Sequence, residues 1–411
     1  MRKKIFVGLL LVIIIFMGWK AAFSDTYKKN YDELYKQVEL FSDTLAIIQK
    51  EYVDETKPKD LIYGALKGML SSLDPHSSFM DPDTYSELKV DTEGKFGGLG
   101  IEITTQDGLL TIITPIEDTP AWKAGIKPKD HIIKINDELT RDMSLADAVK
   151  RMRGKTGVVV NLTILRDSET KLLDFKITRD IIKIKDIKYA RILDDKIGYI
   201  RLVEFRENTL QEFNHALSML FKQGMQALVI DLRNNPGGLL DVAVKITGRF
   251  IDPHKMIVYT KSKNIDQNLE FYSEARSAPL DLPLAILINE GSASGSEIMA
   301  GALQDYKRAI VIGTKSFGKA SVQTVIPLGD GSALRLTTSH YFTPSGKIIK
   351  GKGVTPDILV KETKLSELLK DKEEEKTIKP EQIKKEDAFN YKDDAQLICA
   401  INTLKGIIIY K

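Results

Sequence analysis

Residues 283–298 read Pro-Leu-Ala-Ile-Leu-Ile-Asn-Glu-Gly-Ser-Ala-Ser-Gly-Ser-Glu-Ile. The apolar run over 283–288 predicts a buried strand, and the residues from Glu297 to Gln304 are compatible with a helix. Ser294 therefore falls in a strand-to-helix turn, beside free backbone N–H groups and the positive end of a helix dipole. This environment suits a nucleophile whose attack creates an oxyanion, although Ser is also a favoured helix N-cap residue.

A second stretch supplies a candidate base. Residues 309–313 predict another buried strand, and the loop that follows carries Lys319 ahead of a strand-like run over 321–326. Residues 313–319 match the first seven positions of a phosphate-binding loop. Ala320 stands where that loop needs a hydroxyl residue, and no helix follows to receive phosphates, which argues against a nucleotide site.

A neutral lysine amine can activate a serine when burial lowers its pKa. Phe317, Ala320 and Val322 offer Lys319 the apolar neighbours that such a shift requires. Lys315 is the nearest rival, and none of the five histidines stands in a motif with a serine and an acid. Lys319 and Lys315 are therefore the two candidate bases.

A crossover unit is predicted upstream of these stretches. Strand-like runs at 198–205 and 227–233 enclose a segment, 209–225, whose apolar residues recur at helical spacing. The turn 235–238, Asn-Pro-Gly-Gly, ends the second run. Its glycines permit positive φ and the close approach of a substrate carbonyl.

Taken together and in order, these motifs resemble the carboxyl-terminal processing peptidases, also called tail-specific proteases. The likeness runs over residues 40–360 and includes the segments 231–238 and 341–353. It implies a mixed α/β fold, with a crotonase- or ClpP-like protease core, an inserted PDZ domain and flanking helical segments. It also implies that Ser294 is the nucleophile, that Lys319 is the general base and that Gln323 orients the lysine.

The resemblance further implies an oxyanion hole built from backbone N–H groups. We expect the N–H of Gly237 or Gly238 to pair with that of Gly295. The family usually has Ala after the serine, but Gly295 supplies the same backbone donor.

Ahead of the core, the chain resembles a PDZ domain. Residues 95–103 predict a Gly-rich loop that enters a strand, and residues 120–136 continue the likeness. PDZ domains add an extended peptide to a sheet and hold its terminal carboxylate on loop N–H groups. We expect the peptide-binding groove to use Gly98, Leu99, Gly100, Ile101, Leu145 and Val149, the last two on a helix that opens at Ser144.

The predicted organisation runs from a signal peptide or membrane anchor through three folded regions to a charged tail. Its parts are residues 1–24, the signal or anchor; 25–90, a helical region and dimerisation candidate; 91–175, the PDZ domain; 176–360, the serine protease core; and 361–411, a charged linker with a C-terminal helical segment. Residues 5–19 carry no charge and follow a basic start, which indicates export with the basic end inside.

Composition excludes several other classes. A net charge of +3 is too small to indicate nucleic-acid binding. The single cysteine, Cys399, cannot form an internal disulfide. The sequence shows no cluster with metal-ligand spacing and no cofactor loop, so we expect neither a metal nor a cofactor.

The sequence thus predicts an exported serine endopeptidase that cuts proteins near their C-termini at the extracytoplasmic (periplasmic) face of the membrane. Its PDZ domain is expected to recognise the substrate tail or to gate activity. The expected partners are protein substrates with exposed apolar C-terminal tails, a second copy of the chain, an activating protein, and the membrane through the N-terminus. Two alternatives are a catalytically silent PDZ scaffold and an acyl-CoA enzyme on the crotonase fold. Ser294, Lys319 and Gln323 together argue against both.

Overall fold

The computed structural model describes residues 32–363 and 391–410, with gaps at 107, 117, 142 and 275–278. The predicted signal or anchor, and the charged segment over 364–390, lie outside the described residues. The chain divides into two units, the first ending at Asp81 and the second beginning at Pro82.

The first unit is mainly helical, as the pattern predicts. A helix over 32–51 is followed by α2 (Pro58–Ser71) and the short strand β1 (Ser78–Met80). The helix over 32–51 is almost entirely exposed. Among the described helices of the whole chain, none is both long and apolar enough to cross a membrane.

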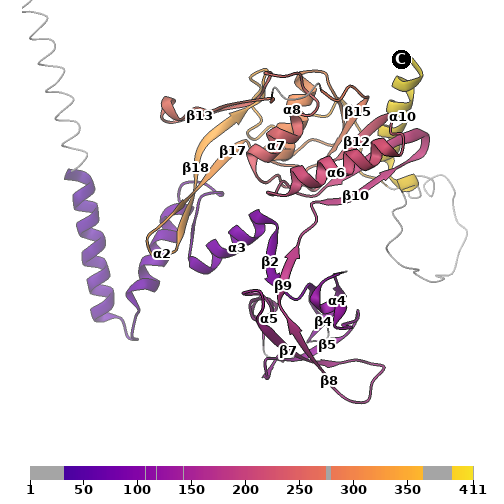
Figure 1. The fold of residues 1–411 in the computed structure, drawn as a ribbon. Helices are drawn as coiled ribbons and strands as arrows, with labels where there is room; N and C mark the ends of the chain where they lie inside the picture. Colours follow the sequence, from indigo (N-terminus) through magenta and orange to yellow (C-terminus); the bar gives the residue numbers. More distant parts are fainter. Residues whose placement is uncertain are drawn as a thin grey trace, which may run out of the picture. The chain divides into compact units, whose positions relative to one another are not determined.

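A six-stranded sheet forms the centre of the predicted protease core (Figure 1). Its order is β10 (Ile187–Ile192), β11 (Ile197–Leu202), β12 (Ala227–Asp231), β15 (Leu284–Ile288), β16 (Ile310–Gly313) and β19 (Ile358–Leu359). Only the β10–β11 pair is antiparallel. The helix α6 (Thr209–Lys222) joins the parallel strands β11 and β12, so the predicted crossover unit is confirmed.

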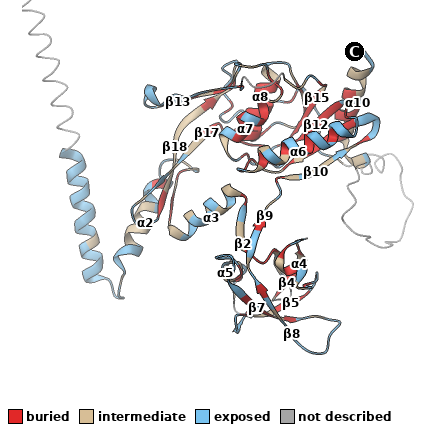
Figure 2. Ribbon diagram, in the orientation of Figure 1, coloured by how far each residue is buried: buried red, intermediate tan, exposed pale blue. Residues whose placement is uncertain are grey.

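The central strands β12 and β15 are buried on both faces, which explains their apolar runs. On β12, Leu228 and Ile230 pack with α6, α7 (Leu240–Thr247) and α8 (Gly295–Asp305). The alternate residues Ala227 and Val229 pack with the C-terminal helix α10 (Ala395–Tyr410). Figure 2 shows these central strands and the inner sides of the helices as buried. The apolar face of α10 therefore packs on this sheet.

A second, antiparallel sheet carries the segment after Lys319. It contains β17 (Ser321–Pro327), β18 (Ala333–Phe342), β13 (Met256–Ser262) and β14 (Glu270–Tyr272). The hairpin of β17 and β18 places Val325 opposite Arg335.

The PDZ module has its own sheet and its own core. Its strands are β3 (Ile101–Gln106), β4 (Leu109–Pro115), β5 (His131–Ile135), β6 (Glu138–Leu139), β7 (Val159–Leu165) and β8 (Leu173–Thr178), and its helices are α4 (Pro120–Lys123) and α5 (Leu145–Met152). The segment α3 (Pro82–Glu93) precedes it, and β2 (Lys95–Gly98) pairs with β9 (Asp180–Lys183).

The prediction of a single loop before the first PDZ strand was wrong in one respect. Half of the Gly-rich segment is itself the strand β2, and only Leu99 and Gly100 separate it from β3. The pairing with β9, more than eighty residues later in the sequence, extends this segment. Because the partner strand is so distant in the sequence, the Gly-rich segment itself carries no local pattern that predicts a strand.

Candidate active site

Ser294 stands at the turn between β15 and α8. It is the N-cap of α8, and its φ of 52° and ψ of −114° lie outside the regions that L-residues usually adopt. Strained backbone of this kind is typical of nucleophiles exposed at a sharp strand-to-helix turn. Ser294 is half-buried and lines a cavity of about 420 Å³. The predicted turn is therefore present, and it opens on a cavity.

The neighbouring serines have structural hydrogen bonds. Ser292 and Ser296 are both 0% exposed. Ser292 Oγ donates to the carbonyl of Leu232 at 2.8 Å, and Ser296 Oγ donates to the carbonyl of Asn235 at 3.0 Å. These two hydroxyls fasten the turn to the segment after β12, which leaves Ser294 as the serine of this motif that faces the cavity.

Lys319 lines the same cavity as Ser294. Burial lowers the pKa of its amine below the ordinary lysine value, the positive charge of Arg335 lowers the pKa further, and the Glu297 carboxylate acts in the opposite direction. Ser294 and Lys319 both donate their backbone N–H groups to Glu297, each at 3.0 Å, and within the described chain no hydrogen bond joins their side chains.

The surroundings of Lys319 differ in part from the expectation. Ala320 is buried and Val322 lines the cavity, as predicted. Phe317 does not shield the amine, because its side chain is 61% exposed. The rival Lys315 is exposed and lines a different cavity, so it is not placed to reach Ser294.

Gln323 also lines the cavity, from β17. Its amide nitrogen donates to Ser321 Oγ at 2.8 Å and more weakly to Thr337 Oγ1 at 3.5 Å. These bonds leave the amide oxygen as the group available to Lys319. The orienting role of Gln323 stays a prediction.

The Asn-Pro-Gly-Gly turn packs directly against the turn of Ser294. A Cβ on Gly237 would lie 2.6 Å from Ser294 Cβ and 2.7 Å from the backbone nitrogen of Gly295. The N–H of Gly237 donates to Asn235 Oδ1 at 2.8 Å and is thus already engaged. Gly238 lines the cavity, and its N–H has no acceptor in the described part of the chain. Of the two predicted donors, Gly238 is therefore the better placed.

A buried carboxylate, Glu297, connects the serine turn to the lysine loop. It is 0% exposed and lies one turn into α8. Its donors are Ser316 Oγ (2.6 Å), Gly318 N–H (2.6 Å), Ser294 N–H (3.0 Å), Lys319 N–H (3.0 Å) and Tyr341 OH (3.2 Å). This role was not predicted from the sequence. The only available signal was the acid three residues after a serine, which is typical of any capping box.

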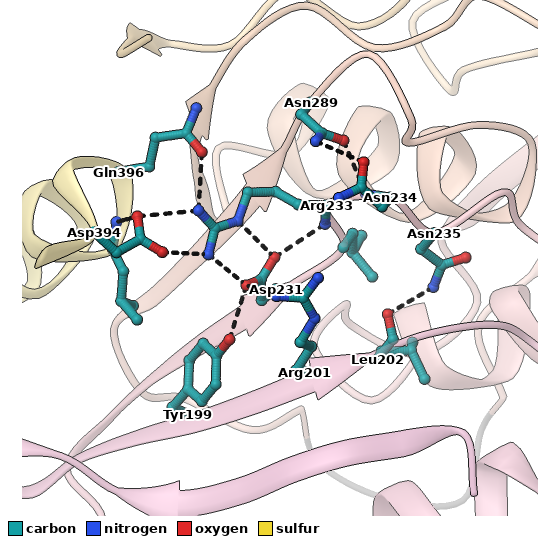
Figure 3. A network of polar contacts seen from close by, with 12 residues as sticks. Tyr199, Arg201, Leu202, Asp231, Arg233, Asn234, Asn235, Asn289, Asp394 and Gln396 are labelled. Atoms are coloured by element: carbon teal, nitrogen blue, oxygen red, sulfur yellow. Dashed lines mark hydrogen bonds and ion pairs between the residues drawn. The ribbon is translucent and has the colours of Figure 1, made fainter. Parts of the chain in front are cut away.

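A second buried network anchors the strand that leads into the glycine turn (Figure 3). Asp231 is 0% exposed and accepts from Tyr199 OH at 2.8 Å and from the Arg233 guanidinium at 2.7 and 3.0 Å. Arg233 also contacts Asp394 at 2.7 and 3.0 Å and Gln396 at 3.0 Å, both at the start of the C-terminal segment. Burial alone would raise the pKa of Asp231, but the hydrogen bonds and charge of Arg233 hold it below the ordinary value.

Asparagines fix the turn itself. Asn234 N–H donates to Asn289 Oδ1 at 2.8 Å, and Asn289 Nδ2 donates to Asn234 Oδ1 at 2.9 Å. Asn235 Nδ2 donates to the carbonyl of Leu202 at 2.9 Å. Figure 3 shows these residues clustered beside the Asp231 and Arg233 pair. The turn is thus held by groups that follow β15 and end β11.

Comparison with known proteins identifies the family. The model of Peptidase family S41 matches residues 196–360, and that of the PDZ domain matches residues 97–177. A carboxy-terminal-processing protease of Bartonella bacilliformis is 45% identical over 337 residues, which cover 81% of this chain and 77% of the relative. The chain belongs to peptidase family S41.

Further S41 relatives agree with this assignment. A probable CtpA-like serine protease of Staphylococcus epidermidis is 37% identical over 334 residues, covering 81% of this chain and 67% of the relative. A solved structure of a putative S41 protease from Bacteroides fragilis, 16% identical, aligns with a TM-score of 0.50 over 88% of this chain and 97% of that chain, which shows the fold. The family model described as Activating protease CtpB N-terminal domain matches residues 18–84. Three predictions are therefore confirmed: the resemblance to the carboxyl-terminal processing peptidases, the mixed α/β fold class with a PDZ domain, and the serine peptidase class.

The PDZ module of this S41 peptidase contains a small cavity of about 70 Å³. Four of the predicted groove residues line it, together with Phe96, Met152 and Arg153: Leu99, Gly100, Ile101 and Val149. Gly98 instead pairs with Asp180 in the β2–β9 ladder, and Leu145 is 41% exposed and does not line the cavity. Their contact with a peptide stays a prediction.

Proposed function

We propose that this S41 peptidase cleaves exported proteins near their C-termini by a Ser294 and Lys319 mechanism. The observation that carries the proposal is that these two residues line one cavity, while burial lowers the pKa of the lysine. A base must be neutral to accept a proton, and a lowered pKa increases the neutral fraction near neutral pH.

In the proposed reaction, a rotation of the side chains brings Ser294 Oγ within hydrogen-bond reach of the Lys319 amine. The hydroxyl oxygen attacks the scissile carbonyl while the amine accepts its proton, and the N–H groups of Gly295 and Gly238 receive the negative charge on the carbonyl oxygen. The resulting ammonium group gives the proton to the leaving amine, so that an acyl-enzyme and the C-terminal fragment result. Water, activated by the same amine, then releases the N-terminal fragment. Gln323 accepts a hydrogen bond from Lys319 through its amide oxygen and so orients the amine.

We further propose that the PDZ cavity captures the substrate tail. Within the described chain, the N–H groups of Leu99 and Gly100 have no acceptor, and Arg153 lines the same cavity. Free N–H groups with a nearby guanidinium suit a terminal carboxylate. Amidation of the substrate's C-terminus should therefore weaken capture, and equal processing of free-acid and amide substrates would argue against tail recognition.

Dimerisation and membrane attachment belong to the N-terminal part of the proposal. On the exposed helix over 32–51 and just beyond it, apolar residues alternate at spacings of four and three: Leu34, Val38, Phe41, Leu45, Ile48 and Tyr52. This stripe is typical of a helix that pairs with a second copy. The match of residues 18–84 to a domain of an activating protease, and the uncharged run over 5–19, support an activating partner protein and an extracytoplasmic location.

One experiment tests the catalytic proposal. Purified protein is incubated with a protein substrate that ends in an apolar tail, beside the variants Ser294→Ala, Ser292→Ala and Ser296→Ala. We expect Ser294→Ala to abolish cleavage without loss of folding or tail binding, because only this serine faces the cavity. Cleavage by Ser294→Ala and none by a folded Ser292→Ala or Ser296→Ala would contradict the assignment. Tail binding by the unmodified protein without any cleavage would favour the silent scaffold.

A further inference from the structure

The catalytic cavity holds more positive charge than its own acids neutralise. The charged residues that line it are Asp91, Glu204, Arg206, Lys319 and Arg335. Arg206 forms ion pairs with Asp91 at 3.2 Å and with Glu204, and it also pairs with Asp186 at 2.5 Å. Arg206 therefore forms an ion pair with each of the two acids that line the cavity.

Arg335 is left without such a partner. In the described part of the chain, the side chain of Arg335 has no hydrogen bond and no ion pair, and its Nε is buried without an acceptor. Lys319 is the cavity's other remaining cation, and it must be neutral to act as a base. Arg335 remains charged at any working pH, because a guanidinium does not give up its proton.

The position of Arg335 suits contact with a bound chain. It lies on β18 opposite Val325 of β17, and both residues line the cavity with Ser294. It is close enough to Lys319 for its charge to help lower the pKa of that amine. A half-buried guanidinium with an unmet donor is unfavourable unless an acceptor arrives from outside the chain.

We propose that Arg335 is a specificity-determining residue that binds a carboxylate of the polypeptide in the catalytic cavity. The planar guanidinium matches a carboxylate through two parallel hydrogen bonds, which makes this the ligand chemistry that the residue recognises best. Two groups of a substrate supply it: an acidic side chain near the scissile bond, or the terminal carboxylate of a short tail. The inference rests on the proposed function, since it assigns substrate chemistry to the same site.

The test compares the unmodified enzyme with Arg335→Gln on matched peptides. The peptides carry Glu or Gln near the scissile bond and end in a free acid or an amide, in all four combinations. We expect the unmodified enzyme to prefer one carboxylate over its amide about ten-fold or more in kcat/KM, and the preference to fall to about one in Arg335→Gln. A preference for Glu identifies the side chain, and a preference for the free acid identifies the terminus. An effect of amidation that acts through the PDZ module would persist in Arg335→Gln.

Three comparisons separate recognition of a carboxylate by Arg335 from other effects of the substitution, including a change in the pKa of Lys319. Loss of the Arg335 charge raises the pKa of Lys319, so rates are compared on the plateau above that pKa for each enzyme. Lys352→Gln removes a positive charge from an exposed residue that lines another cavity, and should leave all preferences unchanged. Arg335→Lys keeps the charge without the planar fork and should retain only part of the preference.

Binding measured without turnover makes the inference independent of catalysis. Affinities of the four peptides are measured for Ser294→Ala and for Ser294→Ala combined with Arg335→Gln. If the unmodified protein cleaves nothing, the proposed function fails, yet the binding preference still decides the role of Arg335. The inference is overturned if Arg335→Gln, correctly folded, weakens all four peptides by the same factor or changes none of them.

Discussion

Substituting Glu297 by Gln probes how the serine turn and the lysine loop are held together. The amide keeps one acceptor oxygen and replaces the other with a donor. If the retained oxygen faces Ser294, Lys319 and Tyr341, the hydrogen bonds from Ser316 Oγ and Gly318 N–H are lost, both 2.6 Å long. Each hydrogen bond to a charged group contributes about 1.5–3 kcal/mol, so the gross loss is about 3–6 kcal/mol.

Part of this loss is offset, because the variant no longer buries a charge. We expect a net destabilisation of about 2–4 kcal/mol, which for a domain of about 150–250 residues, the size of the protease core, lowers the Tm by about 4–16 °C. The matched control is Glu290→Gln, which changes an exposed glutamate near the same turn and should leave the Tm unchanged.

The same substitution also predicts a shift in the pH dependence of activity. The Glu297 carboxylate raises the pKa of Lys319, so its removal lowers that pKa. Because the active amine is neutral, the rising limb of kcat/KM should move to lower pH. The plateau should fall at the same time, since the two catalytic segments are no longer clamped. If Glu297→Gln left the Tm and the pH profile of kcat/KM unchanged, Glu297 would not hold the serine turn and the lysine loop together. A limb that moves to higher pH would refute the electrostatic argument.

Further outcomes follow from the same geometry. In the unmodified enzyme, kcat/KM should rise with pH through a lysine pKa below the ordinary value of 10.5. Lys319→Arg, checked for folding by circular dichroism, should be as inactive as Lys319→Ala because a guanidinium keeps its proton. Turnover by a folded Lys319→Arg would show that another residue is the base. Gly238→Ala should abolish activity, because a Cβ there would lie 2.2 Å from the carbonyl oxygen of Phe205 and the φ of 131° strains any other residue. Asp394→Asn should destabilise the fold by about 1–3 kcal/mol in denaturant unfolding, because Arg233 loses a charged partner at the C-terminal segment; an unchanged midpoint would show that this contact is dispensable.

Local sequence patterns predicted the elements that carry the candidate catalytic residues. The apolar run before Ser294 forms β15, the segment after it forms α8, and the crossover through α6 connects parallel strands. Each of these features depends on residues within a few positions of one another, because strand and helix periodicity and turn sterics act over that range. The fold class was predicted from the resemblance to the carboxyl-terminal processing peptidases, and it is confirmed.

Contacts between distant segments were not predictable in this way. Arg233 meets Asp394 across 161 residues of sequence, and Glu297 meets Gly318 across 21. The exposed position of Phe317 and the pairing of β2 with β9 were likewise misjudged, since an apolar residue or a glycine run has no local mark of its partner.

The sequence by itself determined that Ser294, the candidate nucleophile, lies at a strand-to-helix turn, and the resemblance to the family indicated Lys319 as the candidate base. Only the tertiary structure decided that Ser294, Lys319 and Arg335 line one cavity, and that Gly238 rather than Gly237 has a free N–H. The pKa of Lys319, which lies in a loop, likewise depends on burial and on Arg335, sixteen residues away on β18. Burial, charge proximity and hydrogen-bond satisfaction are properties of how separate segments pack, so no single segment of sequence encodes them.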